Sequence, residues 1–377
     1  MKQVHFLMLF VFTVFFIGES FALPRFSLKS GAKCEDCHFN PTGGELRTDR
    51  GWNFGKKFLP MNSQEKEDFL MTNKIGDNIF FGLDLRGQYL VKTTEENTRT
   101  DFQRMSASIY TAVDLSDKIS VQARYDFIQQ IYEGYAVAKI LPNESYIKGG
   151  TFSPNYGLRI DDHTAYTRGG DLGFLFTTGN RQGLIYEPRY VESGAEVGVY
   201  VDEYAFLTAS VGNPRQQLFQ TDPSYTANLM ITPPTGEDVH IFFGGSYSNF
   251  KDQRFDANFR TIYPEVQMYG GYIGLGAAGF TLIGEYDMAN DLIVTDTKSG
   301  ALMIEASYRI IKGLDAVVRY DRFDPNSDFD KDEVSRVVFG FEFFPYSFIE
   351  IKPQFRLQME DPDVNNNSFV IQSHIYY

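Results

Sequence analysis

Cys34 and Cys37 are the only two cysteines of the chain; they lie three positions apart, and His38 directly follows the second. This C-x-x-C-H spacing is the attachment signature of a c-type haem. Both thiols form thioethers with the vinyl groups of such a haem, and the adjacent imidazole binds the iron on its proximal side. The motif therefore predicts one covalent haem c, held by these three residues.

Three other roles for the two cysteines stay open. A zinc site needs about four ligands, and this segment has no second pair of Cys or His. A thioredoxin-like redox pair needs a βαβ context, whereas the rest of the chain predicts β-strands. A structural disulfide would form in an oxidising compartment, but between these two cysteines it would close almost no loop. Haem attachment is the role that uses His38 as well.

The motif does not determine the sixth ligand of the iron. Met61 is favoured because it follows Pro60 just before a predicted helix that has Asn62 as its N-cap. Methionine is also the usual alternative to a second histidine. Met71, at the far end of that helix, and His163, in a later loop, are the other candidates. The ordinary role of both methionines would be core packing.

Residues 1–22 have the pattern of an export signal peptide. An apolar run from Val4 to Ile17 follows a lysine, and small residues occupy Ser20 and Ala22. The run is short for a membrane span, so cleavage after Ala22 is predicted, with an uncleaved anchor as the alternative. No later stretch offers about 20 consecutive apolar residues, and no transmembrane helix is predicted.

Residues 78–377 repeat an alternation of apolar and polar side chains with a period of two. Residues 79–92, 104–115 and 350–359 show it most clearly, and Met105 falls on an apolar face. Such strands suit a soluble sandwich or a membrane barrel, in which apolar side chains face lipid and polar ones line a wet lumen. Export, strand length, the absence of further cysteines and the number of repeats favour an all-β, antiparallel transmembrane β-barrel.

Sixteen strands are predicted, and an even number is usual in closed bacterial barrels. Short connections alternate with longer polar ones, which is typical of the periplasmic and extracellular ends respectively. The predicted strands span residues 78–92, 102–115, 119–131, 134–141, 145–153, 193–201, 204–212, 225–233, 239–248, 265–278, 280–289, 301–311, 314–323, 334–345, 349–359 and 368–377.

The connection after the fifth strand is about forty residues long, and a loop of this length usually has a function. Its position resembles that of the porin loop that folds into the lumen and narrows it. A solvated surface loop is the alternative. The predicted pore constriction consists of its side chains Arg159, Asp161, Asp162, His163 and Arg168.

Residues 22–38, ALPRFSLKSGAKCEDCH, resemble the start of the fused outer-membrane monohaem cytochrome–porins of iron-oxidising bacteria. In that family a Pro-x-Phe and a small-residue glycine step precede the haem motif, and a 16-strand porin follows. Leu28 and Ser30 replace the Arg and Thr of the family pattern, and the NPTGGELR that follows the motif is also typical of other porin-like cytochromes. The resemblance implies electron transfer at the haem, with iron as the substrate. The matching residues are Pro24, Phe26, Gly31, Cys34, Cys37 and His38.

Three parts are predicted: a signal peptide over residues 1–22, a small α-helical, cytochrome c-like domain over residues 23–77, and a 16-stranded barrel over residues 78–377. The whole chain has a net charge of −14. Residues 23–77 contribute +1, because nine Lys and Arg stand against eight Asp and Glu, so the barrel carries −15. An acidic barrel raises the local concentration of cations at its mouth.

Two functions follow as predictions. In the first, the chain lies in the outer membrane of a Gram-negative bacterium and passes electrons through its haem between an extracellular donor, with Fe(II) as the candidate, and the periplasm. In the second, it is a porin for ions or small solutes whose haem domain is a periplasmic tether or sensor. A protease or lipase is not supported, because no G-x-S-x-G or H-E-x-x-H motif occurs. Any enzymatic activity would be iron oxidation.

The predicted partners follow from the first function. They are outer-membrane lipid, an extracellular electron donor or cation, and a periplasmic electron-carrier cytochrome. No nucleic-acid partner is predicted, and the oligomeric state, monomer or trimer, stays open.

Overall fold

The structure is a computed structural model that describes residues 25–30, 32–63, 72–93, 97–160, 162–170, 183–184, 190–213, 222–236, 238–256, 258–329, 331–360 and 366–377. The predicted signal peptide, the helix predicted after Asn62, Met71 and Asp161 lie outside these residues.

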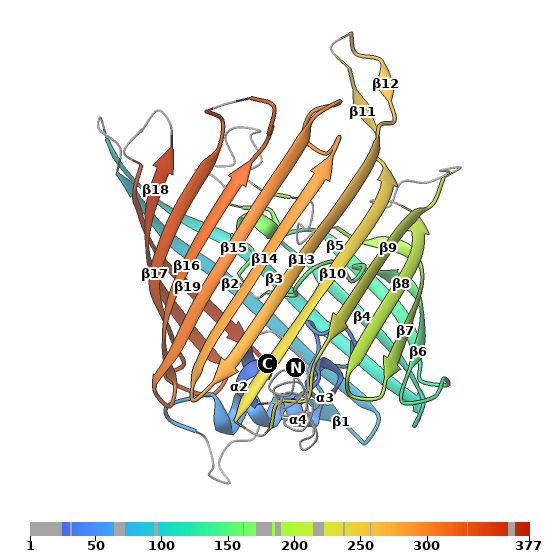
Figure 1. Cartoon of the computed structure of the whole chain (residues 1–377). Helices are drawn as coiled ribbons and strands as arrows, with labels where there is room; N and C mark the ends of the chain where they lie inside the picture. Colours follow the sequence, from blue (N-terminus) through green and yellow to red (C-terminus); the bar gives the residue numbers. More distant parts are fainter. Residues whose placement is uncertain are drawn as a thin grey trace, which may run out of the picture.

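Sixteen antiparallel strands close into a barrel, as predicted (Figure 1). The ring closes because β19 pairs with β2 and β9 pairs with β10. The barrel strands are β2 (Ile79–Thr93), β3 (Thr98–Ser116), β4 (Ile119–Asp126), β5 (Ile131–Ala138), β6 (Tyr146–Phe152), β7 (Glu192–Val201), β8 (Ala205–Asn213), β9 (Ser224–Ile231), β10 (Val239–Lys251), β13 (Glu265–Ala277), β14 (Phe280–Asn290), β15 (Lys298–Ile311), β16 (Leu314–Asp324), β17 (Val334–Phe343), β18 (Ile349–Glu360) and β19 (Ser368–Tyr376).

Three two-residue strands lie outside this ring. β1 (Lys74–Ile75) pairs with the start of β2, and β11 (Arg254–Phe255) pairs with β12 (Thr261–Ile262) in a separate hairpin. This hairpin projects beyond the barrel at the top of Figure 1.

The two ends of the barrel differ in the length of their connections. One end, here named the turn end, has tight turns such as 278–279 and 312–313, where Gly279 and Gly313 adopt positive φ angles of 79° and 83°. The other, named the loop end, carries longer connections, including residues 252–264. The turn end lies at the bottom of Figure 1. This asymmetry confirms the predicted alternation of short and long connections.

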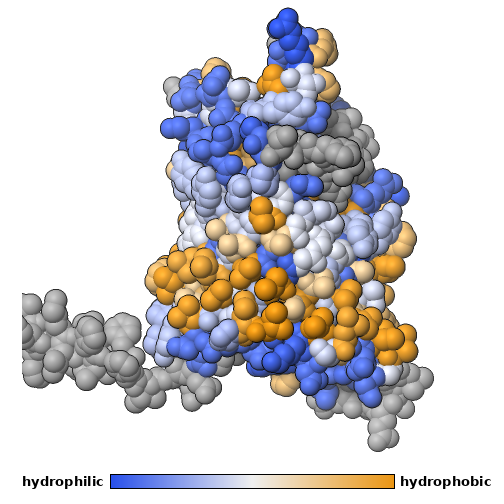
Figure 2. Space-filling view, turned by 90° about the vertical axis from the view of Figure 1, so that its right-hand side faces the viewer, coloured by the Kyte–Doolittle hydropathy of each residue, from blue (hydrophilic) through white to orange (hydrophobic). Residues whose placement is uncertain are grey.

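Side chains alternate between the lumen and the outer surface as the sequence predicts. In β18, Phe355 and Leu357 are 45% and 37% exposed, whereas Arg356 between them is 1% exposed. Figure 2 shows hydrophobic residues gathered in a band across the face in view, with hydrophilic residues above and below it. An apolar outer band around a polar interior is the arrangement of a transmembrane barrel.

Met105 is an exception to the predicted alternation. It was expected on the outer face but lies inside and is 5% exposed. The register between β2 and β3 shifts at this point, because Arg86 pairs with Ser106 and Gly87 with Arg104, which leaves Met105 as an extra residue. A bulge of this kind moves the following side chains to the opposite face.

Residues 25–62, here named the N-terminal insert, lie in the turn end of the barrel (Figure 1). They form the short helices α2 (Arg25–Ser30), α3 (Cys34–Cys37) and α4 (Asp49–Asn53), followed by the π-helical turn η1 (Phe54–Phe58). Leu28 packs with side chains of β9, β10 and β13 in one buried cluster. Trp52 packs on Phe348, with ring centroids 5.4 Å apart. None of the helices in the described part of the chain is long and apolar enough to cross a membrane.

The expectation of a separate α-helical, cytochrome c-like domain is not confirmed. The longest helix described in the insert is α2, with six residues. So short a segment cannot bury a hydrophobic core of its own, and its apolar side chains instead use the barrel lining as their partner. The insert is therefore part of the filling of the barrel.

We name the long connection between β6 and β7, residues 153–191, the lumen loop; its described residues, 153–160, 162–170, 183–184 and 190–191, include several that bond the inner side of the barrel wall. Its backbone bonds the wall, since Gly157 N donates to Ser246 Oγ at 2.8 Å and Leu158 N to Glu285 Oε1 at 2.8 Å. Its short helix η2 (Tyr166–Arg168) places Arg168 against Glu285, with an N–O distance of 2.6 Å. The loop thus starts at β6 and contacts β10 and β14, which are far from it in sequence.

Candidate functional site

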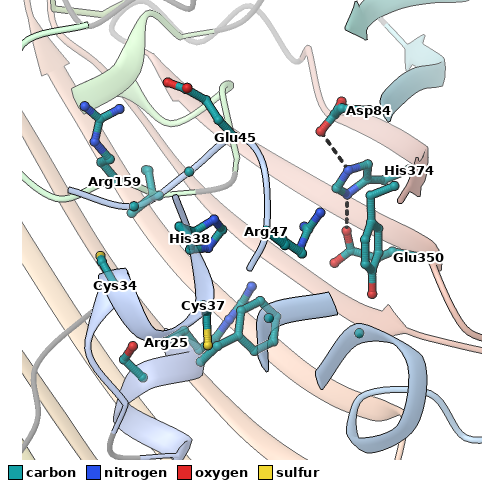
Figure 3. A pocket seen from close by; sticks show the side chains of 18 of the residues that line it. Arg25, Cys34, Cys37, His38, Glu45, Arg47, Asp84, Arg159, Glu350 and His374 are labelled. Carbon is teal, nitrogen blue, oxygen red and sulfur yellow. Dashed lines mark hydrogen bonds and ion pairs between the residues drawn. The ribbon is translucent and has the colours of Figure 1, made fainter. Parts of the chain in front are cut away.

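A cavity of about 330 Å³ lies between the N-terminal insert and the lumen loop. Cys34, Cys37 and His38 all line it, as Figure 3 shows. The lumen loop contributes Arg159 and His163, among others, and the barrel strands supply the rest of the wall. The three residues of the haem motif therefore line one cavity inside the barrel.

The backbone around the motif is held by a short ladder. The single helical turn α3 places Cys34 and Cys37 on one segment, and His38 N donates to Cys34 O at 2.8 Å. His38 then pairs with Arg47 in an antiparallel bridge, and Phe39 N donates to Leu46 O at 3.1 Å. Because of this ladder, the backbone of His38 is held by hydrogen bonds as in a strand, rather than lying in an unpaired loop.

The residues NPTGG, which follow the motif, form the turn of that ladder. Asn40 Nδ2 donates to Gly43 O at 3.1 Å, and Gly43 N donates to Asn40 O at 2.8 Å. Gly43 has a φ of 87°, and a Cβ on it would lie 2.6 Å from Cys34 Sγ. Glycine is therefore required here both by the backbone conformation and by the space that the Cys34 sulfur occupies.

Helix α4 approaches the second cysteine through a glycine. Thr48 is its N-cap, and the Thr48 hydroxyl donates to Asp36 O at 2.6 Å. A Cβ on Gly51 would lie 2.1 Å from Cys37 O, so no larger residue fits without displacing the helix. The close contact seats α4 directly on the motif.

The protonation states of the motif suit ligation better than thiol chemistry. Burial, and next the charge of Arg47, lowers the pKa of His38 to about 3, so the imidazole is neutral. Neutral imidazole is the form that binds metals. Burial raises the pKa of both Cys34 and Cys37, which is opposite to the activated thiolate of a redox pair.

The alternatives to haem attachment gain no support here. Cys34 and Cys37 are not joined by a disulfide. Within the described residues, no group of three or more His, Cys, Asp or Glu side chains is arranged to hold a metal ion, so a zinc site of protein ligands is not found.

A haem fits the residues that the cavity presents. His38 Nδ1 is buried and accepts or donates no hydrogen bond in the described part of the chain. An unpartnered buried nitrogen is costly, and the ring of His38 borders the cavity, so it has room for a further group. Two cysteines and a neutral imidazole on one short segment match the donor set of a c-type haem.

The three candidates for the sixth ligand are placed differently. Met61 does not line the cavity: its N donates to Phe344 O at 2.8 Å, and a Cβ on Gly313 would lie 2.4 Å from the same nitrogen. These contacts hold Met61 against the turn end, so the structure does not bring it together with His38. Met71 lies outside the described residues. His163, in the lumen loop, lines the cavity.

One group of cavity-lining side chains was not among the site residues predicted from the sequence. His374 Nδ1 lies 2.9 Å from Glu350 Oε2, and His374 Nε2 lies 3.0 Å from Asp84 Oδ2 (Figure 3). Both ring nitrogens are thus engaged by carboxylates, which leaves neither for an iron. The three residues lie on inward positions of β2, β18 and β19, and that parity marked them as lumen residues. Their meeting depends on the closure of the barrel between β19 and β2.

The predicted constriction residues have two different roles. Arg159 and His163 line the cavity, and Arg168 borders it while its guanidinium is buried against Glu285. Asp162 is tied to the wall, because Arg319 NH1 lies 2.8 Å from Asp162 Oδ2. Asp162 and Arg168 therefore anchor the lumen loop rather than stand free in a pore.

No known family model matches the chain, and no curated protein sequence matches it. Among solved structures, it is similar to OmpT, an outer membrane protein of Vibrio cholerae, with 11% identity and a TM-score of 0.55 over 81% of this chain and 100% of that one. OprB of Pseudomonas putida gives 10% identity and a TM-score of 0.58 over 80% and 94% of the two chains. OmpF of Salmonella typhi gives 11% identity and a TM-score of 0.54 over 80% and 98%. At such identity the likeness shows the fold alone, and that fold is the barrel of outer-membrane porins.

Proposed function

We propose that this chain is an outer-membrane protein that holds one haem c inside its barrel and transfers electrons between an extracellular donor and the periplasm. The observation that carries the proposal is the placement of Cys34, Cys37 and His38 around one cavity in the lumen. A haem that only tethered the chain would not need to be surrounded by the barrel and by the lumen loop.

The barrel supports the membrane part of the proposal. Its apolar outer band suits lipid, and its short turns are typical of the periplasmic side. The turn end, with the N-terminal insert, would then face the periplasm, and the loop end would face the outside. Tags at residues 325–329 would be reached from outside intact cells. If tags at Lys312-Gly313 were reached instead, the barrel would have the opposite orientation.

The residues around the cavity have separable tasks in this function. A haem supplies one-electron chemistry when it is bound. Cys34 and Cys37 would hold it covalently, His38 would offer the proximal nitrogen, and His163 is the sixth-ligand candidate that lines the cavity. The engaged imidazole of His374 and the guanidinium of Arg47, which stacks 4.4 Å above the ring of Tyr376, would shape the polar side of the site. The lumen loop would exclude bulk water from the loop end.

Ferrous iron is the donor that the sequence favours. The net charge of −15 on residues 78–377 would concentrate cations at the barrel mouth. The resemblance of residues 22–38 to the cytochrome–porins of iron-oxidising bacteria points to the same substrate. Any other small cationic reductant would be gathered in the same way.

A second function is favoured by the comparisons. The similar solved structures are outer-membrane proteins of the porin fold, and DcaP of Acinetobacter baumannii, also similar, is described as an outer membrane channel. On this basis the chain would conduct ions or small solutes, and the haem-bearing insert would serve as a tether or sensor on the periplasmic side.

Two measurements separate these functions. Protein made in a host with a c-type maturation system should carry a haem that survives denaturing electrophoresis and stains for peroxidase activity. In sealed liposomes of uniform orientation, Fe(II) added on the loop side should then reduce that haem, and single-channel conductance should be low. High, steady conductance with a haem that does not respond to Fe(II) would favour the porin. A folded, colourless protein from that host would end the haem proposal.

A further inference from the structure

The outer face of the N-terminal insert exposes one large apolar side chain. Of the apolar side chains described in the insert, only that of Phe58 is largely exposed, at 64%, while the adjacent Leu59 is 5% exposed. Phe58 is the last residue of η1, whose π-turn is closed by the hydrogen bond from Leu59 N to Phe54 O at 3.1 Å. Turns of this type are frequent at functional sites.

Phe58 continues a row of rings that begins in the cavity. Its ring stacks on that of Phe54, with centroids 6.2 Å apart and planes inclined by 20°. Phe54 and Phe26, which meet edge to face at 6.2 Å, both line the cavity. The wall of the cavity and the exposed surface are therefore separated at this point by two stacked side chains.

The surroundings of Phe58 are basic. Lys57 is exposed and has no ion-pair partner in the described part of the chain. Lys56, in the same turn η1, lies 4.9 Å from the centre of the Trp52 ring. An exposed aromatic side chain with a charged rim has the composition of a protein-binding patch. This rim has a positive sign, although the chain as a whole is strongly acidic.

We infer that Phe58, with Lys56 and Lys57 directly before it in η1, is the docking surface for a small soluble electron carrier that has an acidic rim around an apolar cofactor edge. The inference rests on the proposed electron transfer, and it names the place where the partner binds. Charge complementarity selects the carrier: a basic rim attracts an acidic partner and repels a basic one. The interfaces of such complexes are small and transient, so one aromatic contact with a charged rim is large enough to form one.

The step at this surface is the transfer of one electron. With a haem held by Cys34, Cys37 and His38, its iron would give one electron to the carrier and change from Fe(II) to Fe(III), so no proton or leaving group would be required. Phe58 and Phe54 take no part in bond changes. Their task is to bring the carrier to the exposed face of the insert at a point where Phe54 connects that face with the wall of the cavity.

Binding is measured first, because it does not require the haem. The probe is an acidic flavodoxin, and its affinity for the full-length protein in nanodiscs is measured by thermophoresis at low and high salt. Phe58→Ala should weaken binding about tenfold, as truncation of a central aromatic contact does. Lys57→Glu should weaken it about fivefold at low salt and less at high salt, because rim charges are screened.

Two control variants match these changes at places away from the patch. Phe259→Ala removes an aromatic side chain that is 87% exposed at the loop end, and Lys118→Glu makes the same charge change in another exposed turn of the turn end. Both controls should bind the probe like the wild type. Unchanged affinity of Phe58→Ala, or equal losses in the test and control variants, would overturn the inference.

A second readout connects the patch to electron transfer. Ferricyanide should oxidise the dithionite-reduced, haem-loaded protein more slowly after Lys57→Glu than after Lys118→Glu, with a difference that disappears at high salt. Equal rates in the two variants would count against the surface. Absence of covalent haem would defeat the proposed function, whereas the flavodoxin affinities would still decide whether the docking surface exists.

Discussion

The N-terminal insert and the lumen loop fill the same barrel from opposite ends, but they are held by different contacts. The lumen loop is bonded by buried charges: Arg168 meets Glu285, and Asp162 meets Arg319, with side chains that are at most 9% exposed. The insert has ion pairs as well, such as Lys29 with Asp315 at 2.5 Å, and in addition an aromatic cluster around Trp52. That cluster joins the insert to the two terminal tyrosines of the chain.

The difference shows that the two segments have different structural roles. Directional bonds to strands that are far apart in sequence make the lumen loop a rigid wall of the cavity. Apolar packing seats the insert while its outer face stays exposed to solvent. The two segments share one core, in which Leu28 of the insert packs with Leu158 of the loop and Ile283 of the wall. The cavity lies at that boundary, so both segments are needed to enclose it.

The largest effect is expected from removing the motif of the insert. The double variant Cys34→Ser, Cys37→Ser should lose all covalent haem, because no other thiol exists in the chain to form a thioether. Haem staining after denaturing electrophoresis measures this. The barrel should persist, since its strands do not depend on the motif, and the heat-modifiable migration of the folded form should be unchanged. Retained stain in this variant would contradict the assignment.

The anchor of the lumen loop should give the next largest effect. Arg168→Met leaves Glu285 and Asp287 buried with their charges uncompensated, and loss of one partner of a buried pair costs about 3–5 kcal/mol. Urea unfolding in detergent micelles, followed by heat-modifiable migration, measures the free energy of unfolding. The control is Arg322→Met, whose partner Glu333 is exposed, as is Arg322 itself, at the loop end. That variant should cost about 0–1 kcal/mol, and equal losses would remove the distinction.

Tight packing within the insert predicts a smaller effect. Gly51→Ala places a Cβ 2.1 Å from Cys37 O, so α4 must shift away from the motif. Overpacking of this kind costs about 1–3 kcal/mol, and the yield of attached haem per protein should fall. Gly149→Ala is the control, because a Cβ there meets nothing within 4 Å. If Gly51→Ala attached haem as well as Gly149→Ala, the contact between α4 and Cys37 would not be structural.

The smallest effect is expected at the start of α4. Thr48→Ala removes the hydroxyl that accepts a hydrogen bond from Gly51 N and donates to Asp36 O. Loss of an N-cap costs about 1 kcal/mol. Limited proteolysis of the insert, compared with unfolding of the barrel, should show the change in the insert alone. Thr48→Ser should restore the wild-type rate, and a barrel effect in Thr48→Ala would mean that the two regions are coupled more tightly than the contacts indicate.

Much of the barrel was predictable from the chain, because a strand with one face in lipid repeats its chemistry every two residues. That local period identified all sixteen strands and the long lumen loop. It failed at Met105, where a bulge that depends on the pairing of β2 with β3 reverses the faces. The separate helical domain was not confirmed, since apolar residues in a short segment do not reveal whether they pack together or against another element.

The sequence by itself determined the haem motif, the strand parity and the charge of the barrel, because each depends on residues close together in the chain. Only the tertiary structure decided what surrounds the motif. Closure of the barrel brings Asp84, Glu350 and His374 together, and the fold of the lumen loop carries His163 to the cavity while contacts at the turn end keep Met61 away from it. These contacts join residues from 24 to 290 positions apart in the case of His374 with Glu350 and Asp84, and no local pattern encodes which of the inward side chains will meet.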